Sequence, residues 1–317
     1  MIIAELLKNT TKTLMSFELL PPLKGDNINA IYNTIDPLME FNPSYINVTY
    51  HREEVIYKKR PDGLLEQKTV RKRPGTVGIT AAIMHKYKID VVPHLICAGF
   101  NREETENALI DLHFLGVDNI LVLRGDADKY TRRFEPEPDG HTYAIDLLNQ
   151  VMELNQGVYL DDSEEDMAPT KFSAGVAGYP EKHAEAPNMD ADIRNLKAKV
   201  EAGAEYIVTQ MFFDNQHYFN FVERCRKEEI TVPIVPGLKP ISVKSHLSIL
   251  PNTFHVDIPE TLAREVAAAK DNKAVRQIGI DWAIAQAKEL KAANVPSIHF
   301  YTMGKADNIY QIVKQVY

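Results

Sequence analysis

The residues Ser16-Phe17-Glu18-Leu19-Leu20-Pro21-Pro22 form a short apolar run that carries one carboxylate and ends at two prolines. If this run is a β-strand, Glu18 lies at its carboxyl end, where a charge among apolar neighbours costs free energy unless it is compensated. Seven other short apolar runs in the chain also end in polar residues or glycine. The repetition predicts eight buried strands, because strands that are covered on both faces are continuously apolar.

Segments of helical periodicity separate the predicted strands. The strands cover residues 13–18, 45–49, 90–94, 119–124, 172–178, 206–210, 233–236 and 297–301. The helices cover residues 27–40, 102–115, 192–202, 215–228 and 273–292, and two of them stop at Gly116 and Gly203. This alternation in 317 residues predicts the α/β class and a (β/α)8 TIM barrel, a single domain over residues 1–317. A doubly wound open sheet is the alternative, but the chain has no dinucleotide-binding glycine motif.

The composition excludes several classes of protein. Apolar residues make up 44% of the chain and charged residues 25%, which is typical of a soluble globular protein. The net charge of −8 argues against nucleic acid as the main partner. Cys97 and Cys225 have no metal-ligand spacing, so we expect no metal site and a reducing, cytoplasmic setting. Residues 1–13 do not resemble a signal peptide, and no apolar run is long enough to span a membrane.

Two insertions interrupt the alternation of strands and helices. Residues 57–77 are rich in lysine and arginine, and we expect a solvated loop there rather than a phosphate-binding patch. Residues 155–171 carry five acidic side chains but lack the glycine and the spacing of a calcium loop. We therefore expect an exposed, mobile loop at the second insertion.

In a barrel of this kind, functional side chains come from the carboxyl ends of the strands. The predicted ends carry Glu18, Thr49, His94, Arg124-Gly125-Asp126, Tyr179, Gln210, Gly237 and Tyr301. This set suits proton transfer and hydrogen bonding to a polar heterocycle. It contains no serine or cysteine beside a base, and no lysine for an imine-forming lyase.

Three of these ends allow more than one interpretation. Apolar Leu19 and Leu20 would raise the pKa of Glu18, as a general acid requires, but a helix cap or an arginine partner fits the spacing equally well. His94 is by sequence alone more typical of a buried core histidine than of a ligand contact. The segment 124–126 favours a ligand anchor over a charged turn, because its glycine lets the backbone approach a ligand closely.

A further group of polar residues surrounds the predicted helix at 192–202. Asp192, Asn195 and Lys199 form one polar stripe, for which a solvated face is the simpler interpretation. Tyr179 and His183 lie in the segment that leads into this helix. An aromatic ring, an imidazole and a helix start could together hold a ring and a phosphate.

Taken in order, the motifs of this chain resemble those of the methylenetetrahydrofolate reductase family, in its single-domain bacterial form. The resemblance extends over residues 17–302. It rests on Phe17-Glu18 with Pro21-Pro22, Val48-Thr49-Tyr50, Pro93-His94-Leu95, Leu123-Arg124-Gly125-Asp126, Tyr179-Pro180-Glu181 with His183, Asp192 with Asn195, Leu196 and Lys199, Thr209-Gln210 before Phe212-Phe213-Asp214, Pro236-Gly237, and Phe300-Tyr301-Thr302.

The resemblance implies a barrel that binds FAD without a covalent bond, takes electrons from NADH or NADPH, and reduces 5,10-methylenetetrahydrofolate to 5-methyltetrahydrofolate. It implies that Glu18 is the general acid and that Asp126 lies near both the flavin and the pterin. Gln210, Tyr301 and Lys305 would contact the folate. Folate and nicotinamide would be the partners of a homo-oligomer. The residues implied for FAD are Thr49, His94, Arg124, Gly125, Asp126, Tyr143, Ala144, Ala177, Tyr179, His183, Asp192, Asn195 and Lys199.

Four positions depart from the family pattern. Ala198 stands where a basic residue is usual, and Lys305 stands where an arginine is usual. His246 replaces a glutamine, and Leu250 replaces a phenylalanine. Residues 71–73, Arg-Lys-Arg, are a hypothetical substitute for the phosphate contact that Ala198 lacks. Two other functions stay open from the residues alone. One is a flavin-free barrel lyase or aldolase acting on a small carbonyl or phosphorylated substrate, and the other is a binding protein without turnover.

Overall fold

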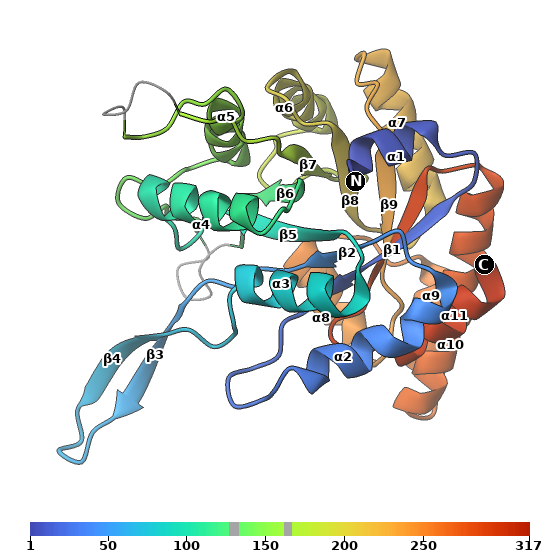
Figure 1. Ribbon diagram of the computed structural model, residues 1–317. Helices are drawn as coiled ribbons and strands as arrows, with labels where there is room; N and C mark the ends of the chain where they lie inside the picture. Colours follow the sequence, from blue (N-terminus) through green and yellow to red (C-terminus); the bar gives the residue numbers. More distant parts are fainter. Residues whose placement is uncertain (127–132, 162–166) are drawn as a thin grey trace.

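Eight parallel strands form a closed barrel in this computed structural model, which describes residues 1–126, 133–161 and 167–317 (Figure 1). The order around the barrel is β1-β10-β9-β8-β7-β6-β5-β2. All eight predicted strands are present, and the predicted (β/α)8 barrel is confirmed. The barrel strands are β1 (Leu14–Leu19), β2 (Tyr45–Val48), β5 (Val91–Ile96), β6 (Asn119–Leu123), β7 (Ser173–Gly178), β8 (Tyr206–Met211), β9 (Ile234–Leu238) and β10 (Ser297–Tyr301).

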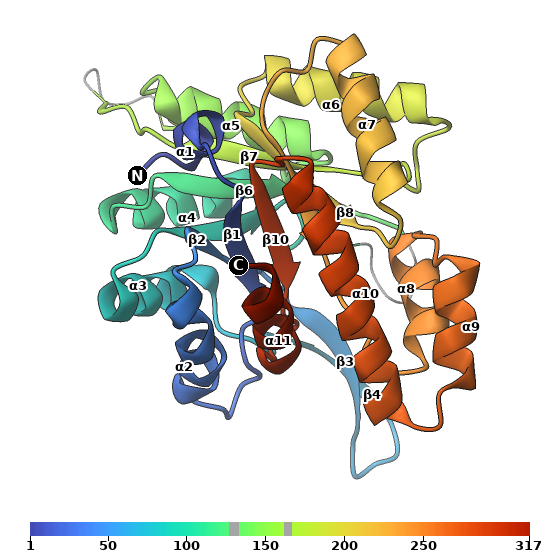
Figure 2. The ribbon, with the colours of Figure 1, turned by 90° about the vertical axis from the view of Figure 1, so that its right-hand side faces the viewer.

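Helices surround the barrel on its outer face (Figures 1 and 2). The predicted helix at 27–40 is divided, because Pro37 has no amide hydrogen with which to continue the α-helical ladder. None of the described helices is both long and apolar enough to cross a membrane. The helices are α1 (Ile3–Asn9), α2 (Asn29–Ile35), the 3-10 helix η1 (Asp36–Phe41), α3 (Thr76–Tyr87), α4 (Arg102–Phe114), α5 (Ala144–Asn155), α6 (Met189–Glu201), α7 (Asn215–Lys227), α8 (His246–Phe254), α9 (Glu260–Ala268), α10 (Asn272–Ala292) and α11 (Asp307–Val316).

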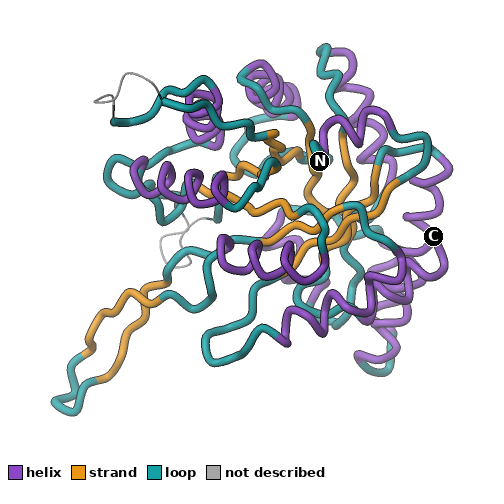
Figure 3. Tube along the Cα trace, in the orientation of Figure 1, coloured by secondary structure: helices purple, strands orange, loops and turns teal. Residues whose placement is uncertain are grey.

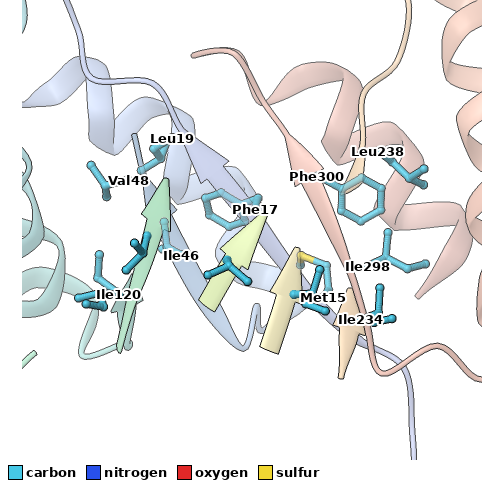
Figure 4. Packing of buried hydrophobic residues seen from close by; sticks show 14 of the residues in the cluster. Met15, Phe17, Leu19, Ile46, Val48, Ile120, Ile234, Leu238, Ile298 and Phe300 are labelled. Atoms are coloured by element: carbon cyan, nitrogen blue, oxygen red, sulfur yellow. The ribbon is translucent and has the colours of Figure 1, made fainter. Parts of the chain in front are cut away.

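Successive residues of each strand point alternately out of and into the barrel. On β1, Met15, Phe17 and Leu19 belong to the outer core that packs against the helices (Figure 4). Ser16 and Glu18 therefore point inward. At the amino-terminal end of the barrel, α1 packs against the inner core, and the functional side chains are left at the carboxyl ends of the strands.

The first insertion, for which a solvated loop was expected, contains most of a β-hairpin whose strands have no fully buried residue. Strands β3 (Glu54–Lys59) and β4 (Leu65–Val70) pair antiparallel and stand apart from the barrel strands in the tube view (Figure 3). Gly63 has φ +85 in the connecting turn, where the amide of Arg60 donates to the carbonyl of Leu64 (2.8 Å). The tip of the hairpin is exposed, as expected of the insertion. Its last residues, from Thr76, begin α3.

The acidic centre of the second insertion, residues 162–166, lies outside the described residues. Its described flanks are anchored by hydrogen bonds. The hydroxyl of Tyr159 donates to the carbonyl of Ala168 (2.8 Å), and the amide of Leu160 donates to Glu106 on α4 (2.9 Å). The expected mobile loop can therefore be compared with the structure only at these two ends.

Candidate active site

Glu18 lies at the barrel mouth between two buried histidines. Its Oε2 is 3.6 Å from Nε2 of His94 and 4.0 Å from Nε2 of His299. The side chain of Glu18 is 14% exposed, so it still reaches the mouth. Asn47 contacts Nε2 of His94 (3.2 Å), and Ser16 contacts Nδ1 of His299 (2.9 Å). The carboxylate is thus oriented by imidazoles from β5 and β10 rather than by an arginine or a helix end.

The structure overturns one expectation for Glu18. Burial is the largest effect on its pKa and raises it, as predicted from Leu19 and Leu20. However, the nearby imidazoles of His299, His94 and His51 together outweigh burial and lower the pKa of Glu18 below its ordinary value. The leucines could not produce the expected rise, because Leu19 faces the outer core and the polar neighbours of Glu18 come from other strands.

Arg124, Gly125 and Asp126 follow β6 directly. Gly125 has φ +89, and a Cβ there would lie 3.0 Å from Cβ of Ala98, so glycine is required at this turn. Asp126 is exposed. The pKa of His51 is lowered, mainly by burial and then by Arg73, while Asp126 and Glu18 oppose the shift. His51 therefore lies in the field of both predicted catalytic carboxylates.

Arg124 makes a bidentate ion pair with Glu185, with N–O distances of 2.6 and 2.7 Å. Its guanidinium also lies 5.0 Å from the ring centre of Phe134. The Glu185 side chain is 57% exposed, whereas that of Arg124 is 19% exposed. The predicted flavin anchor is therefore held in a fixed orientation by the loop that follows β7.

That loop brings several of the predicted FAD residues together. The rings of Tyr179 and His183 pack edge to face at 4.7 Å. The amide of His183 donates to Asp192 on α6 (2.9 Å). Burial raises the pKa of Tyr179 to about 12, and the charges of Asp192 and Arg124 also act on it. The charges of Asp192 and Arg124 therefore act on the same part of the site as the rings of Tyr179 and His183.

Lys199 is a second cation in this part of the site. Its Nζ donates to the carbonyl of Ala177 on β7 (3.2 Å), and burial lowers its pKa to about 8 although Asp192 opposes the shift. Because a carbonyl uses one of its three donors, the ammonium retains donors for an anion. Four other predicted FAD residues come from further elements: Thr49 follows β2, Tyr143 precedes α5, Ala144 lies in the first turn of α5, and Asn195 is exposed on α6.

Tyr301 and Gln210 lie at the ends of β10 and β8, which flank β9, and β8 is the neighbour of β7. The hydroxyl of Tyr301 donates to the carbonyl of Thr209 (2.6 Å). A Cβ on Gly237 would lie 2.6 Å from this hydroxyl, so the glycine makes room for the tyrosine ring. Burial raises the pKa of Tyr301 well above its ordinary value, and Glu18 adds to the rise. Lys305 lies in the exposed turn after β10.

The basic residues 71–73 do not take the place of the contact that Ala198 lacks. Lys72 is paired with Glu54 (2.8 Å), Arg73 donates to the carbonyl of Pro21, and Arg71 lies 6.0 Å from the ring centre of Tyr50. Two strands, β5 and β6, separate β2, which precedes these residues, from β7, which precedes α6. The hypothesis that they substitute at the Lys199 end therefore has no geometric support.

Sequence reasoning missed four polar residues of the mouth: Asn47, His51, His299 and Lys239. His299 lies two residues before Tyr301, so the period of two along the strand would have placed both on the inner face. Lys239 was missed because the predicted strand stopped at residue 236, whereas β9 continues to Leu238. The statement that no strand end carries a lysine was wrong for this reason.

Three ligand-type groups also converge beside the mouth, although no metal-ligand spacing is visible in the sequence. Ligand atoms of Glu181, His217 and Asp257 lie within 4.8 Å of one another. The amide of Asp257 donates to Glu181 (2.5 Å), and burial is the main cause of a raised pKa for Glu181. This contact joins the loop after β7 to the connection between α8 and α9.

The fold and the site together define a (β/α)8-barrel protein whose mouth combines an inward carboxylate, histidines and a buried lysine. The model of the family "Methylenetetrahydrofolate reductase" matches residues 3–317. The chain belongs to the methylenetetrahydrofolate reductase family, as its motifs indicated.

The relatives differ in length. The 5,10-methylenetetrahydrofolate reductase of Escherichia coli is 30% identical over 299 residues, which are 94% of this chain and 88% of that protein. Methylenetetrahydrofolate reductase 1 of Schizosaccharomyces pombe is 30% identical over 96% of this chain but only 46% of its own length. The chain thus spans about half the length of this relative and of those from Caenorhabditis elegans and Arabidopsis thaliana.

A solved structure shares the fold over the whole chain. It is described as an uncharacterized protein from Clostridium thermocellum that binds two copies of 5-methyl-5,6,7,8-tetrahydrofolic acid. The TM-score is 0.60 at 11% identity, covering 100% of this chain and 98% of the other. At this identity the likeness supports the barrel fold alone.

Proposed function

We propose that this protein reduces 5,10-methylenetetrahydrofolate to 5-methyltetrahydrofolate with FAD as cofactor and NADH or NADPH as electron donor. The observation that carries the proposal is the family match over residues 3–317, in a barrel that holds Glu18 at its mouth. Relatives that carry the name of this reductase match over 94% of the chain. We extend the proposal to a cytoplasmic homo-oligomer, as the family resemblance and the cysteine usage indicate.

The residues of the β6 and β7 side fit a flavin dinucleotide. Gly125 adopts a positive φ that lets the backbone approach a ligand, and Lys199 is half-buried with donors to spare for a phosphate. Arg124 supplies a second, oriented cation. When bound, FAD would supply the hydride-transfer chemistry that no side chain of the protein can perform. The chain itself supplies binding, orientation and one proton.

Glu18 is the residue that we assign to proton transfer. Without a ligand its pKa is lowered by His299 and the other imidazoles. A bound ring would cover the exposed part of the side chain, and the loss of water would favour the protonated acid. Glu18 would then donate its proton to a nitrogen of the folate, while Gln210 and Tyr301 orient the substrate from β8 and β10.

One observation favours the alternative of a flavin-free lyase or aldolase. Lys239 is buried at the end of β9, and burial lowers its pKa to about 8, a value suited to imine formation. The family match favours the reductase over this alternative. Trapping a substrate adduct on Lys239 with borohydride, in a protein without flavin, would favour the lyase.

The visible spectrum tests the proposal directly. The purified protein should be yellow, with flavin released by denaturation. Without oxygen, NADH or NADPH should remove the flavin absorbance, and methylenetetrahydrofolate should then restore it. A colourless protein that FAD cannot reconstitute would exclude the reductase. A yellow protein that is bleached but does not respond to the folate would leave a flavoprotein with another acceptor.

A further inference from the structure

Lys239 is a buried charge that the proposed reaction leaves without a role. It follows β9 directly and is 8% exposed. Within residues 1–126, 133–161 and 167–317, its ammonium makes no hydrogen bond or ion pair. A buried ammonium without a partner costs free energy. Such a group is stable when a ligand supplies the missing anion.

The strand register places Lys239 on the inner face of the mouth. On β9, Val235 belongs to the inner core, and Gly237 adjoins the hydroxyl of Tyr301. Lys239 is the next residue in this inward series, because the side chains of a strand alternate. His299 pairs with Gly237, and Glu18 pairs with Tyr301. Lys239, Tyr301 and Glu18 therefore lie at about the same level on three adjacent strands.

The charges that surround Lys239 leave its ammonium free for a ligand. Burial lowers its pKa to about 8, and the carboxylate of Glu18 on β1 opposes the shift. Burial, together with Lys239 itself, lowers the pKa of His246 on α8 to about 4, so this imidazole is neutral near pH 7. Tyr301 on β10 is also neutral, because its pKa is raised. Glu18 attracts Lys239, but the ion-pair contacts that the structure gives Glu18 are with His94 and His299.

We propose that Lys239 is an oxyanion-binding residue of the substrate side of the mouth, which holds a carboxylate or phosphate oxygen of the ligand that lies against Gln210 and Tyr301. This inference rests on the proposed function, which brings two acidic ligands to the mouth. Folate carries glutamyl carboxylates, and the nicotinamide dinucleotide carries phosphates. A lysine ammonium binds either oxyanion as a point charge with three donors.

Substitution of Lys239 separates a ligand contact from a structural role. Lys239→Met keeps much of the side-chain volume but removes the charge. It should weaken binding of the ligand that supplies the oxyanion by about 10- to 100-fold, the effect of losing a charge-assisted hydrogen bond. Lys239→Arg should restore most of this affinity. Without ligand, Lys239→Met should melt at the same temperature as the parent protein or higher, because an uncompensated buried charge is removed.

Lys244→Met is the matched control. Lys244 lies on the same connection between β9 and α8, but it is exposed and donates to the carbonyl of Ala267 (3.0 Å). Its substitution should leave the affinity for every ligand unchanged. The decisive measurement is the affinity of the Lys239→Met variant for its ligands. If this variant binds both 5-methyltetrahydrofolate and NADH as tightly as the parent protein does, the proposal is overturned.

Protection of the amine identifies the source of the oxyanion. Trace acetylation at pH 8, followed by mass spectrometry of peptides, reports the reactivity of Lys239 and Lys244 in one sample. Inorganic phosphate should slow acetylation of Lys239 but not of Lys244. Protection by 5-methyltetrahydrofolate alone identifies a folate carboxylate, and protection by NADH alone identifies a dinucleotide phosphate. Absence of protection by all three probes contradicts the proposal.

The two proposals fail in different ways. Protection by inorganic phosphate requires no turnover, so a protein that reduces no folate can still show the oxyanion site. Conversely, an active reductase whose Lys239 is not protected by any probe lacks this site but retains the proposed function.

Discussion

Oε2 of Glu18 lies 3.6 Å from Nε2 of His94, and both side chains point into the barrel from strands that β2 separates. Burial lowers the pKa of His94 to about 4, although Glu18 opposes the shift. The histidine is therefore neutral near pH 7, where it can orient the carboxylate without a permanent ion pair. Glu18 thus remains free to take up and release a proton.

Glu18→Gln should separate the two halves of the proposed reaction. The amide keeps the size of the side chain but cannot donate the acidic proton. We expect flavin content and NADH oxidation close to those of the parent protein, and folate reduction slower by about 10²- to 10⁴-fold. Rapid-mixing kinetics of each half-reaction measure this. Equal loss in both halves would contradict the assigned role.

Because the pKa of His94 is lowered, we expect the protein to lose stability in acid. The histidine's folded pKa of about 4 lies below the ordinary 6.5, so the unfolded chain binds more protons as the pH falls between these values. The free energy of unfolding should therefore decrease from pH 6.5 towards pH 4, by about 3 kcal/mol for this group. Glu18, whose pKa is lowered, adds to the loss at still lower pH.

Urea unfolding at a series of pH values tests this prediction. His94→Gln has no proton to gain in this range and should show a smaller decrease than the parent protein. His113, an exposed histidine near the end of α4, supplies the control His113→Gln, which should keep the parent slope. Identical slopes for the parent and His94→Gln would refute the prediction.

Gly237→Ala should damage the folate side alone. The added Cβ would overlap the carbonyl oxygen of Thr209 and lie 2.6 Å from the hydroxyl of Tyr301, so the tyrosine must move. We expect weaker folate binding by about tenfold or more, the effect of losing an oriented hydrogen-bonding group. Flavin content should stay at the parent level. Gly78→Ala on α3, where a Cβ meets nothing within 4 Å, is the matched control.

Glu185→Gln should tighten flavin binding if the phosphate of FAD and the carboxylate of Glu185 compete for Arg124. The ion pair is partly exposed, so its loss should change stability by about 1 kcal/mol or less. We expect a several-fold lower Kd for FAD in low salt, and Arg124→Ala should weaken binding. Weaker binding in both variants would instead make Glu185 a residue that positions Arg124. Fluorescence titration of the flavin-free protein measures both constants.

Much of the barrel could be predicted from local patterns. Continuous apolar runs revealed all eight strands, since a strand covered on both faces needs no polar face. The helices α1, α3, α5, α8, α9 and α11 were not predicted, and the hairpin β3–β4 was taken for a loop. Its side chains are largely exposed, so it lacks the apolar pattern that marks a buried strand. Strand pairing there depends on the backbone and on the turn at Gly63 instead.

By itself, the sequence determined which residue types stand at the ends of the strands, including Glu18, Arg124-Gly125-Asp126, Gln210 and Tyr301, because chain order and apolar runs are local properties. Only the tertiary structure decided what surrounds them. Closure of the barrel brings His94 and His299 to Glu18 from other strands and reverses the expected shift of its pKa. Strand β9 ends two residues later than predicted, so Lys239 follows the strand directly as a buried cation at the mouth and is not a loop residue. Charge interactions depend on distance in space, and separation along the chain does not show that distance.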